Sequence, residues 1–561
     1  MRSGLAEQLL SIALWVLTAV YVVSVLLAGL AQPVGRFDEP LPWVAALQIG
    51  RGLVPHSDFW STYPSLTYWI LAGIFSVLGE TAVAARSLGM VVFCLLLTAV
   101  AAVTRRCFEI PNWRVPYAVL LAALGAGPLF VYAFGLALEA SVCTLLVYFL
   151  LSRNQSPWRP ALTPIAGLML CVTMLMRINF ATYIAVVILL DLIYTGRRRG
   201  AGYLFGPMLL GVLVYLLPYR GSLDDVLYQI AIVPQRVFAV TRFIPLPDHP
   251  IYYAAIAWPA SWFAFRMLVA GLVRPTLLLP LAIAGGMCAT AYLTRSNPTL
   301  LPGIAVLEIT TVVVLDRYLF RLDRFERAFL LTYAMFTHYF LWRADDWHLR
   351  PLLTFAGLMI PFLIVPSSWA SHRSWPRILA FMLLPLVAVV SWRIHEFRPR
   401  WAEIRATAEL ARRGELMPGI SDSARFMRAA SSSPLYPDEA ELAALRYVYA
   451  RTGENDCVYV GVSDHAHVFV GDLRAYWLLH RCVGVKRFIL EPGVTTDASD
   501  QAAMVRDLQR NCVRWVVLAP PVKGDAAFLH ANFPGSGLLD EFIAQHYQVA
   551  ASFGSYLVLQ Q

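Results

Sequence analysis

Two adjacent carboxylates, Asp38 and Glu39, follow the first long apolar run of the chain. A carboxylate that faces a cavity can accept the proton of an attacking hydroxyl group, or hold a cation that neutralises a phosphate. The alternative is a hydrated helix end without chemistry of its own. Asp38 and Glu39 are therefore candidate catalytic residues.

A third carboxylate, Glu139, lies between two apolar runs and has almost no polar neighbours in the sequence. The alternative here is a solvated turn residue. If Glu139 is functional, we expect it to act beside Asp38 as a catalytic carboxylate. Together the two residues are candidate ligands of a divalent cation, Mg²⁺, Mn²⁺ or Ca²⁺.

Several further polar residues interrupt apolar sequence. Arg177 offers a permanently charged, bidentate group for a phosphate, although a side chain that reaches the membrane surface would explain it too. Between two later apolar runs, Arg343 could bind an anion, His348 could donate to a phosphate or a sugar hydroxyl, and Asp345 could orient either. A solvated turn is the alternative for that segment.

The elements that would position these residues are membrane helices. The run from Leu9 to Leu30 exceeds the roughly 20 apolar residues that cross a bilayer. Further runs bring the predicted number of spans to about thirteen. They lie near 84–104, 115–134, 138–152, 161–176, 180–195, 201–218, 253–271, 276–293, 299–315, 328–342, 351–366 and 377–392.

The composition agrees with a protein that crosses the membrane many times. Hydrophobic residues make up 58% of the 561 residues, and the formal net charge is +9. The mean hydropathy is +0.60. Because the arginine clusters fall between apolar runs, membrane orientation explains the positive charge and nucleic-acid binding is not expected. We predict an integral protein of the inner (plasma) membrane.

Basic loops alternate along the chain if the N-terminus is cytoplasmic. This alternation requires that Leu66 to Leu78 does not cross the membrane, since about 13 residues cover only roughly 20 Å of a 30 Å core. Counting it as a span, the alternative, would invert every later loop. In the topology with a cytoplasmic N-terminus, the ionisable residues that are hardest to explain structurally all lie at the outer surface. They are Asp38, Glu39, Asp58, Glu139, Arg177, Arg343, Asp345, Asp346 and His348.

Two regions outside the membrane complete the map. Residues 31–83 form an outer loop with short interfacial pieces around Trp43 to Ile49 and Leu66 to Leu78. Residues 1–394 form the membrane domain, and 395–561 form an extracytoplasmic α/β domain. Within that domain we expect strands at Val458–Gly461 and Trp515–Leu518 and a helix over Asp500–Gln509. Two of its three cysteines can pair, but the sequence does not say which.

This layout resembles the GT-C superfamily of polytopic glycosyltransferases. Phe37-Asp38-Glu39 is similar to the acidic motif that follows their first span. The run from Gly52 to Trp69, which includes Pro55, Asp58 and Pro64, resembles a motif of bacterial dolichyl-phosphate-mannose-type transferases. Departures are His56, where a Tyr is usual, and Ser65. Gly79 and Arg86 match the end of the family's loop, Glu139 takes the place of a second acidic residue, and Arg343-x-Asp345-x-x-His348-Leu349 is similar to a later motif.

The resemblance implies a GT-C fold and an inverting glycosyltransferase. Its donor would be a polyprenyl-phosphate-linked sugar, and its acceptor a hydroxyl of a cell-envelope glycan, lipid or protein. Asp38 would be the general base and Glu139 a supporting carboxylate, while Arg177, Arg343 and His348 would neutralise the leaving phosphate. Asp58 and Asp345 would contribute to substrate binding. The rival interpretations are a transporter or flippase, or a non-catalytic assembly subunit of the envelope.

Overall fold

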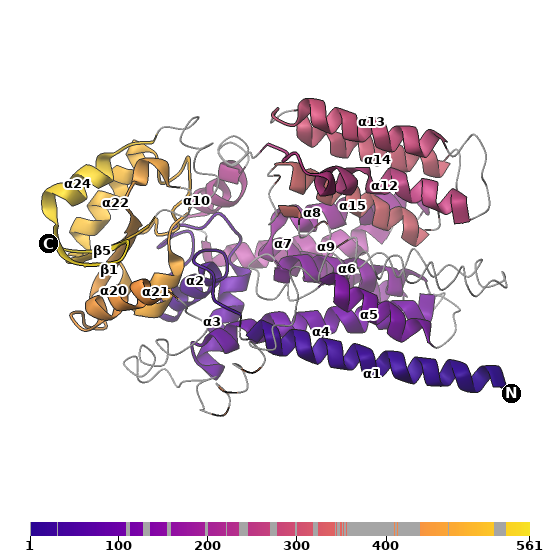
Figure 1. Cartoon of the computed structure of the whole chain (residues 1–561), viewed down its shortest axis with the longest axis horizontal. Helices are drawn as coiled ribbons and strands as arrows, with labels where there is room; N and C mark the ends of the chain where they lie inside the picture. Colours follow the sequence, from indigo (N-terminus) through magenta and orange to yellow (C-terminus); the bar gives the residue numbers. More distant parts are fainter. Residues whose placement is uncertain are drawn as a thin grey trace.

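The computed structural model describes most of the chain. The ranges are 2–30, 32–107, 113–126, 135–153, 159–196, 200–219, 222–234, 245–269, 278–297, 300–317, 324–342, 438–468, 470–520 and 535–561, with Leu322, Ala344, His348, Leu349, Leu352, Phe355, Arg405, Glu409 and Arg412. A bundle of long helices leads to a smaller α/β domain, and two short helices lie where they meet (Figure 1).

The helices of the bundle match the first eleven predicted spans. They are α1 (Arg2–Leu30), α4 (Ala82–Cys107), α5 (Arg114–Ala126), α6 (Gly135–Arg153), α7 (Arg159–Met176), α8 (Ile178–Tyr194), α9 (Gly200–Leu216), α12 (Pro250–Val269), α13 (Leu278–Thr294), α14 (Ile304–Leu315) and α15 (Arg324–Trp342). The predicted spans 351–366 and 377–392 lie almost entirely outside the described residues, so the number thirteen stays a prediction.

In the described part of the chain, four segments are long and apolar enough to cross a membrane: Glu7–Leu30, Ala82–Arg105, Gly135–Ser152 and Gly200–Tyr219. The first and last of these leave most of their apolar side chains uncovered, as a lipid-facing helix does. The N-terminus lies at the end of α1 that is remote from the α/β domain (Figure 1). We expect the two to lie on opposite faces of the membrane, and which face is cytoplasmic stays a prediction.

Arginines of the predicted cytoplasmic loops form ion pairs that the sequence did not indicate. Arg324, at the start of α15, binds the carboxylate of Asp191 on α8, which also accepts a hydrogen bond of 2.6 Å from the Tyr148 hydroxyl of α6. Arg327 donates to Asp316, the residue that follows α14, at 2.5 Å. These pairs connect α6, α8 and α15, and they join the end of α14 to α15.

Two short helices occupy the loop after α1. They are α2 (Pro40–Gly50) and α3 (Leu66–Leu78), which agree with the two predicted pieces. Proline at the start of α2 suits the first turn of a helix, where its missing N–H is not needed. Both helices lie next to the α/β domain (Figure 1) and share a hydrophobic core with it. The loop is therefore part of the contact between the two halves.

A second outer segment follows α9. It contains η2 (Leu217–Tyr219), α10 (Leu223–Leu227) and the π-helical turn η3 (Tyr228–Ile232), and it lies near the same face of the α/β domain (Figure 1). A further short turn, η6 (Leu301–Gly303), leads into α14. Trp60 of the first loop, Val233 of this segment and Val494 of the α/β domain form a small buried cluster. Three regions far apart in the sequence therefore meet here.

The C-terminal domain is an α/β unit, as predicted. Its helices are α20 (Glu439–Tyr449), α21 (Leu473–Leu479), α22 (Ala498–Arg510) and α24 (Leu538–His546), with the short turn η9 (His465–His467). Its strands are β1 (Cys457–Val462), β2 (Cys482–Val483), β3 (Trp515–Ala519), β4 (Gln548–Phe553) and β5 (Tyr556–Gln560). The sheet order is β2-β1-β3-β5-β4. The three predicted elements correspond to β1, β3 and α22, while the boundary near residue 394 lies outside the described residues.

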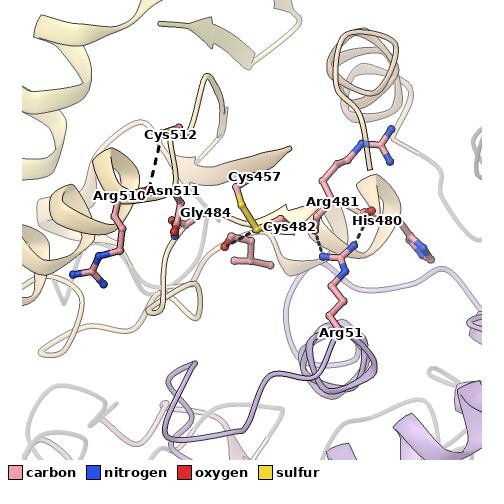
Figure 2. Close-up of a disulfide and its surroundings, with 10 residues drawn as sticks. Arg51, Cys457, His480, Arg481, Cys482, Gly484, Arg510, Asn511 and Cys512 are labelled. Atoms are coloured by element: carbon pink, nitrogen blue, oxygen red, sulfur yellow. Dashed lines mark hydrogen bonds between the residues drawn. A yellow bond between two sulfur atoms is a disulfide. The ribbon is translucent and has the colours of Figure 1, made fainter. Parts of the chain in front are cut away.

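Strand direction changes within this sheet. β1 runs parallel to β2 and β3, whereas β5 is antiparallel to β3 and β4. The parallel strands β1 and β3 are almost completely buried, which explains their continuous apolar sequences. Cys457 of β1 and Cys482 of β2 form a disulfide, and Cys512 is left as an exposed free thiol (Figure 2).

Candidate active site

Asp38 lies in the short connection between α1 and α2. Its side chain is half-buried, and the next residue, Glu39, occupies the N-cap position of α2. The Leu41 N–H donates to the Phe37 carbonyl at 3.1 Å, which folds the backbone around Asp38 into the first turn. A carboxylate at a helix N-terminus is favoured by the partial positive charge there. The position suits a negatively charged base.

The carboxylate of Glu39 is bound by a residue of the helical bundle. It accepts hydrogen bonds from Arg86 of α4, Nε to Oε1 at 2.6 Å and Nη2 to Oε2 at 2.9 Å. Arg86 also donates to the carbonyls of Gly29 and Leu30 at the end of α1, at 3.1 and 2.8 Å. This arrangement gives Glu39 a structural role in joining three elements. Its assignment as a catalytic residue stays a prediction.

Glu139 lies in the first turns of α6. It is 0% exposed, and neither of its carboxylate oxygens has a hydrogen-bond partner among the described residues. A buried carboxylate without a partner is energetically costly, and such groups are often retained for function. Among all residues that the structure describes, no three His, Cys, Asp or Glu side chains are grouped so that they could hold a metal ion. The Asp38 and Glu139 cation site therefore stays a prediction.

Arg177 lies at the N-terminus of α8 and is buried among aromatic rings. Its Nε donates to Asn179 Oδ1 and its Nη2 to the Tyr339 hydroxyl, each at 3.1 Å. The guanidinium group also lies 5.2 Å from the ring centre of Tyr63 in the outer loop. Arg177 is only 8% exposed, so it contacts protein groups instead of extending into solvent.

The ring of His348 contacts the same tyrosine. Its ring centre is 5.0 Å from that of Tyr339 on α15. Arg177 lies 5.3 Å from the Tyr339 ring centre. The structure thus brings together two of the residues that were predicted to neutralise a phosphate. Arg343, the third residue of that prediction, lies outside the described residues, as do Asp345 and Asp346.

Asp58 closes a turn in the outer loop. Its carboxylate accepts from the Val54 N–H, and its own N–H donates to the Val54 carbonyl, both at 2.8 Å. Such bonds are typical of Asp in turns. The side chain is exposed. A role in substrate binding stays a prediction for this residue.

Sequence reasoning missed the contact between His56 and Gln229 of η3. Gln229 Nε2 donates to the His56 carbonyl at 3.0 Å, while Gln229 Oε1 accepts from the Ser61 N–H at 2.9 Å and lies 3.2 Å from His56 Nδ1. His56 is buried with a φ of 67°, a left-handed conformation that is uncommon for a non-glycine residue. No sequence signal links positions that are so far apart in the chain.

The environment of His56 favours its neutral form. Burial lowers the pKa of His56 to about 4, although the hydrogen bond of the ring to Gln229 acts in the opposite direction. Because Gln229 Oε1 can only accept, we assign the ring hydrogen to Nδ1. His56 Nε2 is then an acceptor, and it has no hydrogen-bond partner among the residues that the structure describes.

The fold of this chain is similar to that of a solved structure. The crystal structure of ArnT from Cupriavidus metallidurans bound to undecaprenyl phosphate aligns over 98% of this chain and 97% of its own, with a TM-score of 0.55 and 12% sequence identity. The chain has a GT-C-type fold. The predicted type of fold is thereby confirmed, and the similarity covers the bundle together with the α/β domain. Membership of the GT-C superfamily stays a prediction.

Other comparisons add little to this result. The oligosaccharyltransferase AglB from Archaeoglobus fulgidus, in complex with an inhibitory peptide and a dolichol-phosphate, aligns over 91% of this chain and 69% of its own, with 14% identity. Its TM-score of 0.32 is too low to establish a shared fold. No family model and no curated protein matches the sequence.

Proposed function

We propose that this protein transfers a sugar from a polyprenyl-phosphate donor to a hydroxyl group of a cell-envelope glycan, lipid or protein. The observation that carries this proposal is the similarity, over nearly the full length of both chains, to a structure bound to undecaprenyl phosphate. The clustering of Arg177 and His348 around Tyr339 supports it, because cationic and hydrogen-bond donor groups suit a phosphate. The reaction would take place at the outer membrane face.

Asp38 is the proposed general base. Its carboxylate accepts the proton of the acceptor hydroxyl as that oxygen attacks the anomeric carbon. The bond between the anomeric carbon and the phosphate oxygen breaks, and polyprenyl phosphate leaves with the electron pair of that bond. A single displacement of this kind inverts the configuration at the anomeric carbon.

The leaving phosphate needs positive charge and hydrogen-bond donors. Arg177 supplies a guanidinium group that its contacts with Asn179 and Tyr339 already orient. Preorganised donors of this kind stabilise charge that develops during the reaction. His348, whose ring also contacts Tyr339, would contribute a second donor, with Arg343 as a further donor and Asp345 and Asp58 in substrate binding.

Glu139 is the proposed supporting carboxylate. Its two oxygens, which lack hydrogen-bond partners among the described residues, fit the oxygen ligands that a divalent cation prefers. Such a cation, when bound, would neutralise phosphate charge. The chemistry above needs no step through it, because Asp38 holds the proton and Arg177 faces the phosphate charge.

The test is transfer by the purified full-length protein in lipid nanodiscs. A panel of radiolabelled polyprenyl-phosphate sugars is offered with an envelope extract as acceptor, and labelled product is separated from labelled donor. We expect one donor class to yield product at a rate proportional to protein concentration. Binding of polyprenyl phosphate without transfer of any sugar in the panel would instead favour a flippase or an assembly subunit.

A further inference from the structure

The C-terminal domain holds the backbone immediately before Asp38. The N–H groups of Leu473 and Arg474, in the first turn of α21, donate to the carbonyl of Arg36 at 2.8 and 3.0 Å. The side chain of Arg474 reaches further along the same segment and donates from Nη1 to the Val34 carbonyl at 2.8 Å. Two carbonyls of the connection between α1 and α2, those of Val34 and Arg36, are thus bound by residues in the first turn of α21.

The side chain of Arg36 strengthens the same contact. Its Nη2 donates to Asp438 at 2.6 Å, and its Nε lies 3.8 Å from Asp472. These two carboxylates are the N-caps of α20 and α21, where they accept backbone hydrogen bonds from Glu441 and Ala475. Arg36 therefore joins the beginnings of two helices of the C-terminal domain.

Arg474 is itself oriented by a buried partner. Its guanidinium group forms two hydrogen bonds with the carboxylate of Glu441 on α20, one of them from Nε at 3.1 Å. Arg474 is 5% exposed and Glu441 is 1% exposed. A buried, bidentate pair of this kind fixes the plane of the guanidinium group, so that Nη1 is aimed at the Val34 carbonyl.

The contact extends beyond this segment to the whole outer loop. Trp477 of α21 packs against Trp43 of α2, with ring centres 5.1 Å apart, and against Phe75 of α3 at 5.6 Å. Arg51, which follows α2, donates to the carbonyls of His480 and Arg481 beside the disulfide (Figure 2). The loop that carries Asp38 is therefore packed on the C-terminal domain as well as on the membrane helices.

Asp38 lies between two fixed points that belong to different halves of the protein. Arg36, two residues earlier, is bound by the C-terminal domain, and Glu39, the next residue, is bound by Arg86 of α4. We propose that Arg36 and Arg474 are positioning residues for Asp38, and that the C-terminal domain completes the active site by holding the segment that carries the base. This inference rests on the proposed function of Asp38.

The first test compares kcat with KM in the full-length protein. The double variant Arg474→Met/Glu441→Leu removes both buried charges at once, so that neither is left unpaired. Misplacement of a catalytic group by about 1 Å can lower a rate about 100-fold. We expect kcat to fall between about 10- and 100-fold, while the donor KM stays within about twofold because the phosphate contacts are untouched. Arg36→Gln, at a partly exposed position, should lower kcat in the same direction.

Tyr547→Phe is the matched control. It removes a buried hydrogen bond of 2.7 Å to the Val513 carbonyl within the same domain, away from the Val34 to Arg36 segment. We expect it to lower the melting temperature and to leave kcat unchanged. Wild-type kcat in the double variant and in Arg36→Gln, or an equal loss of kcat in Tyr547→Phe, would overturn the positioning role.

The second test does not depend on activity. A nitroxide is attached at Gly35→Cys, where an added Cβ atom meets no atom within 4 Å, in a background that keeps Cys457 and Cys482 as the only other cysteines. We expect its spectrum to show greater mobility in the Arg474→Met/Glu441→Leu variant and an unchanged spectrum in Tyr547→Phe. Equal mobility in all three proteins would contradict the inference, whereas a wild-type protein that binds donor but transfers no sugar would contradict the proposed function alone.

Discussion

The guanidinium group of Arg86 holds the carboxylate of Glu39 through two hydrogen bonds, at 2.6 and 2.9 Å, in an environment where both side chains are buried. Nη1 of Arg86 donates to the carbonyls of Gly29 and Leu30 at the end of α1. The two acidic residues of the motif therefore have different surroundings. Glu39 has its oxygens engaged by one arginine, and Asp38, half-buried, is placed at the start of α2.

This difference predicts different effects of two conservative substitutions. Glu39→Gln leaves the buried Arg86 charge without its counter-ion, and breaking a buried pair in this way costs about 3–5 kcal/mol. We expect a larger fall in melting temperature for Glu39→Gln than for Asp38→Asn, measured by differential scanning fluorimetry in detergent. Equal melting temperatures for both variants would argue against a structural role of Glu39.

Replacing Glu139 should stabilise the protein and at the same time lower its activity. Because its carboxylate is buried without a hydrogen-bond partner in the described structure, Glu139→Leu should raise the melting temperature. If Glu139 supports the reaction, kcat should fall about tenfold or more in the same variant.

Glu308→Leu provides the control for Glu139. Glu308 is also fully buried, on α14, and no role in the proposed reaction is assigned to it. We expect a similar rise in melting temperature with an unchanged kcat. A Glu139→Leu enzyme with wild-type kcat would remove Glu139 from the mechanism.

Arg177 should determine donor affinity through its planar guanidinium group. A lysine keeps the charge but cannot donate to Asn179, Tyr339 and a phosphate at once. Charge-assisted hydrogen bonds contribute about 1.5–3 kcal/mol, so Arg177→Lys should weaken polyprenyl-phosphate binding about 10- to 100-fold. Tyr339→Phe removes only one neutral partner and should have a smaller effect. Unchanged Kd values by isothermal titration would place the phosphate elsewhere.

The lowered pKa of His56 predicts that the stability of the folded protein depends on pH. Its pKa is lowered from 6.5 to about 4 by burial, so the unfolded chain binds the proton more readily than the folded protein does. The stability that the neutral ring contributes is present above pH 6.5 and is lost as the pH falls towards 4. The difference corresponds to about 3 kcal/mol.

His56→Asn tests this dependence, because asparagine tolerates a left-handed backbone and does not titrate. Melting temperatures measured from pH 4 to pH 7 should fall less steeply at acidic pH in the variant than in the wild-type protein. Parallel curves would show that the pKa of His56 is the same in the folded and the unfolded state.

The sequence predicted the periodic parts of the fold well. Apolar runs located α4, α6 and α9, and the short run Leu66–Leu78 matches α3 residue for residue, because helix formation there follows from local hydrophobic pattern. Buried strands such as β1 were recognisable for the same reason. The acidic motif around Asp38 was found because polar residues are rare in this chain.

Contacts between residues that are distant in the sequence could not be predicted from the hydrophobic pattern. Nothing in the sequence around Arg474 indicates that it donates to Val34, 440 positions away, and nothing pairs His56 with Gln229. The disulfide partners, Cys457 and Cys482, could be chosen only once β1 and β2 were known to be neighbours. Such contacts depend on how elements pack in three dimensions, which hydrophobic periodicity does not encode.

The most direct test of Asp38 as the general base is the single-turnover rate of sugar transfer with saturating donor and acceptor. Asp248→Asn, an exposed substitution of the same kind in the outer segment before α12, serves as the control. General base catalysis contributes about 10²–10⁴-fold, so Asp38→Asn should lower the rate by that factor with donor binding retained, and Asp248→Asn should not. A rate in Asp38→Asn within about threefold of wild type would fall far short of that factor and contradict the account.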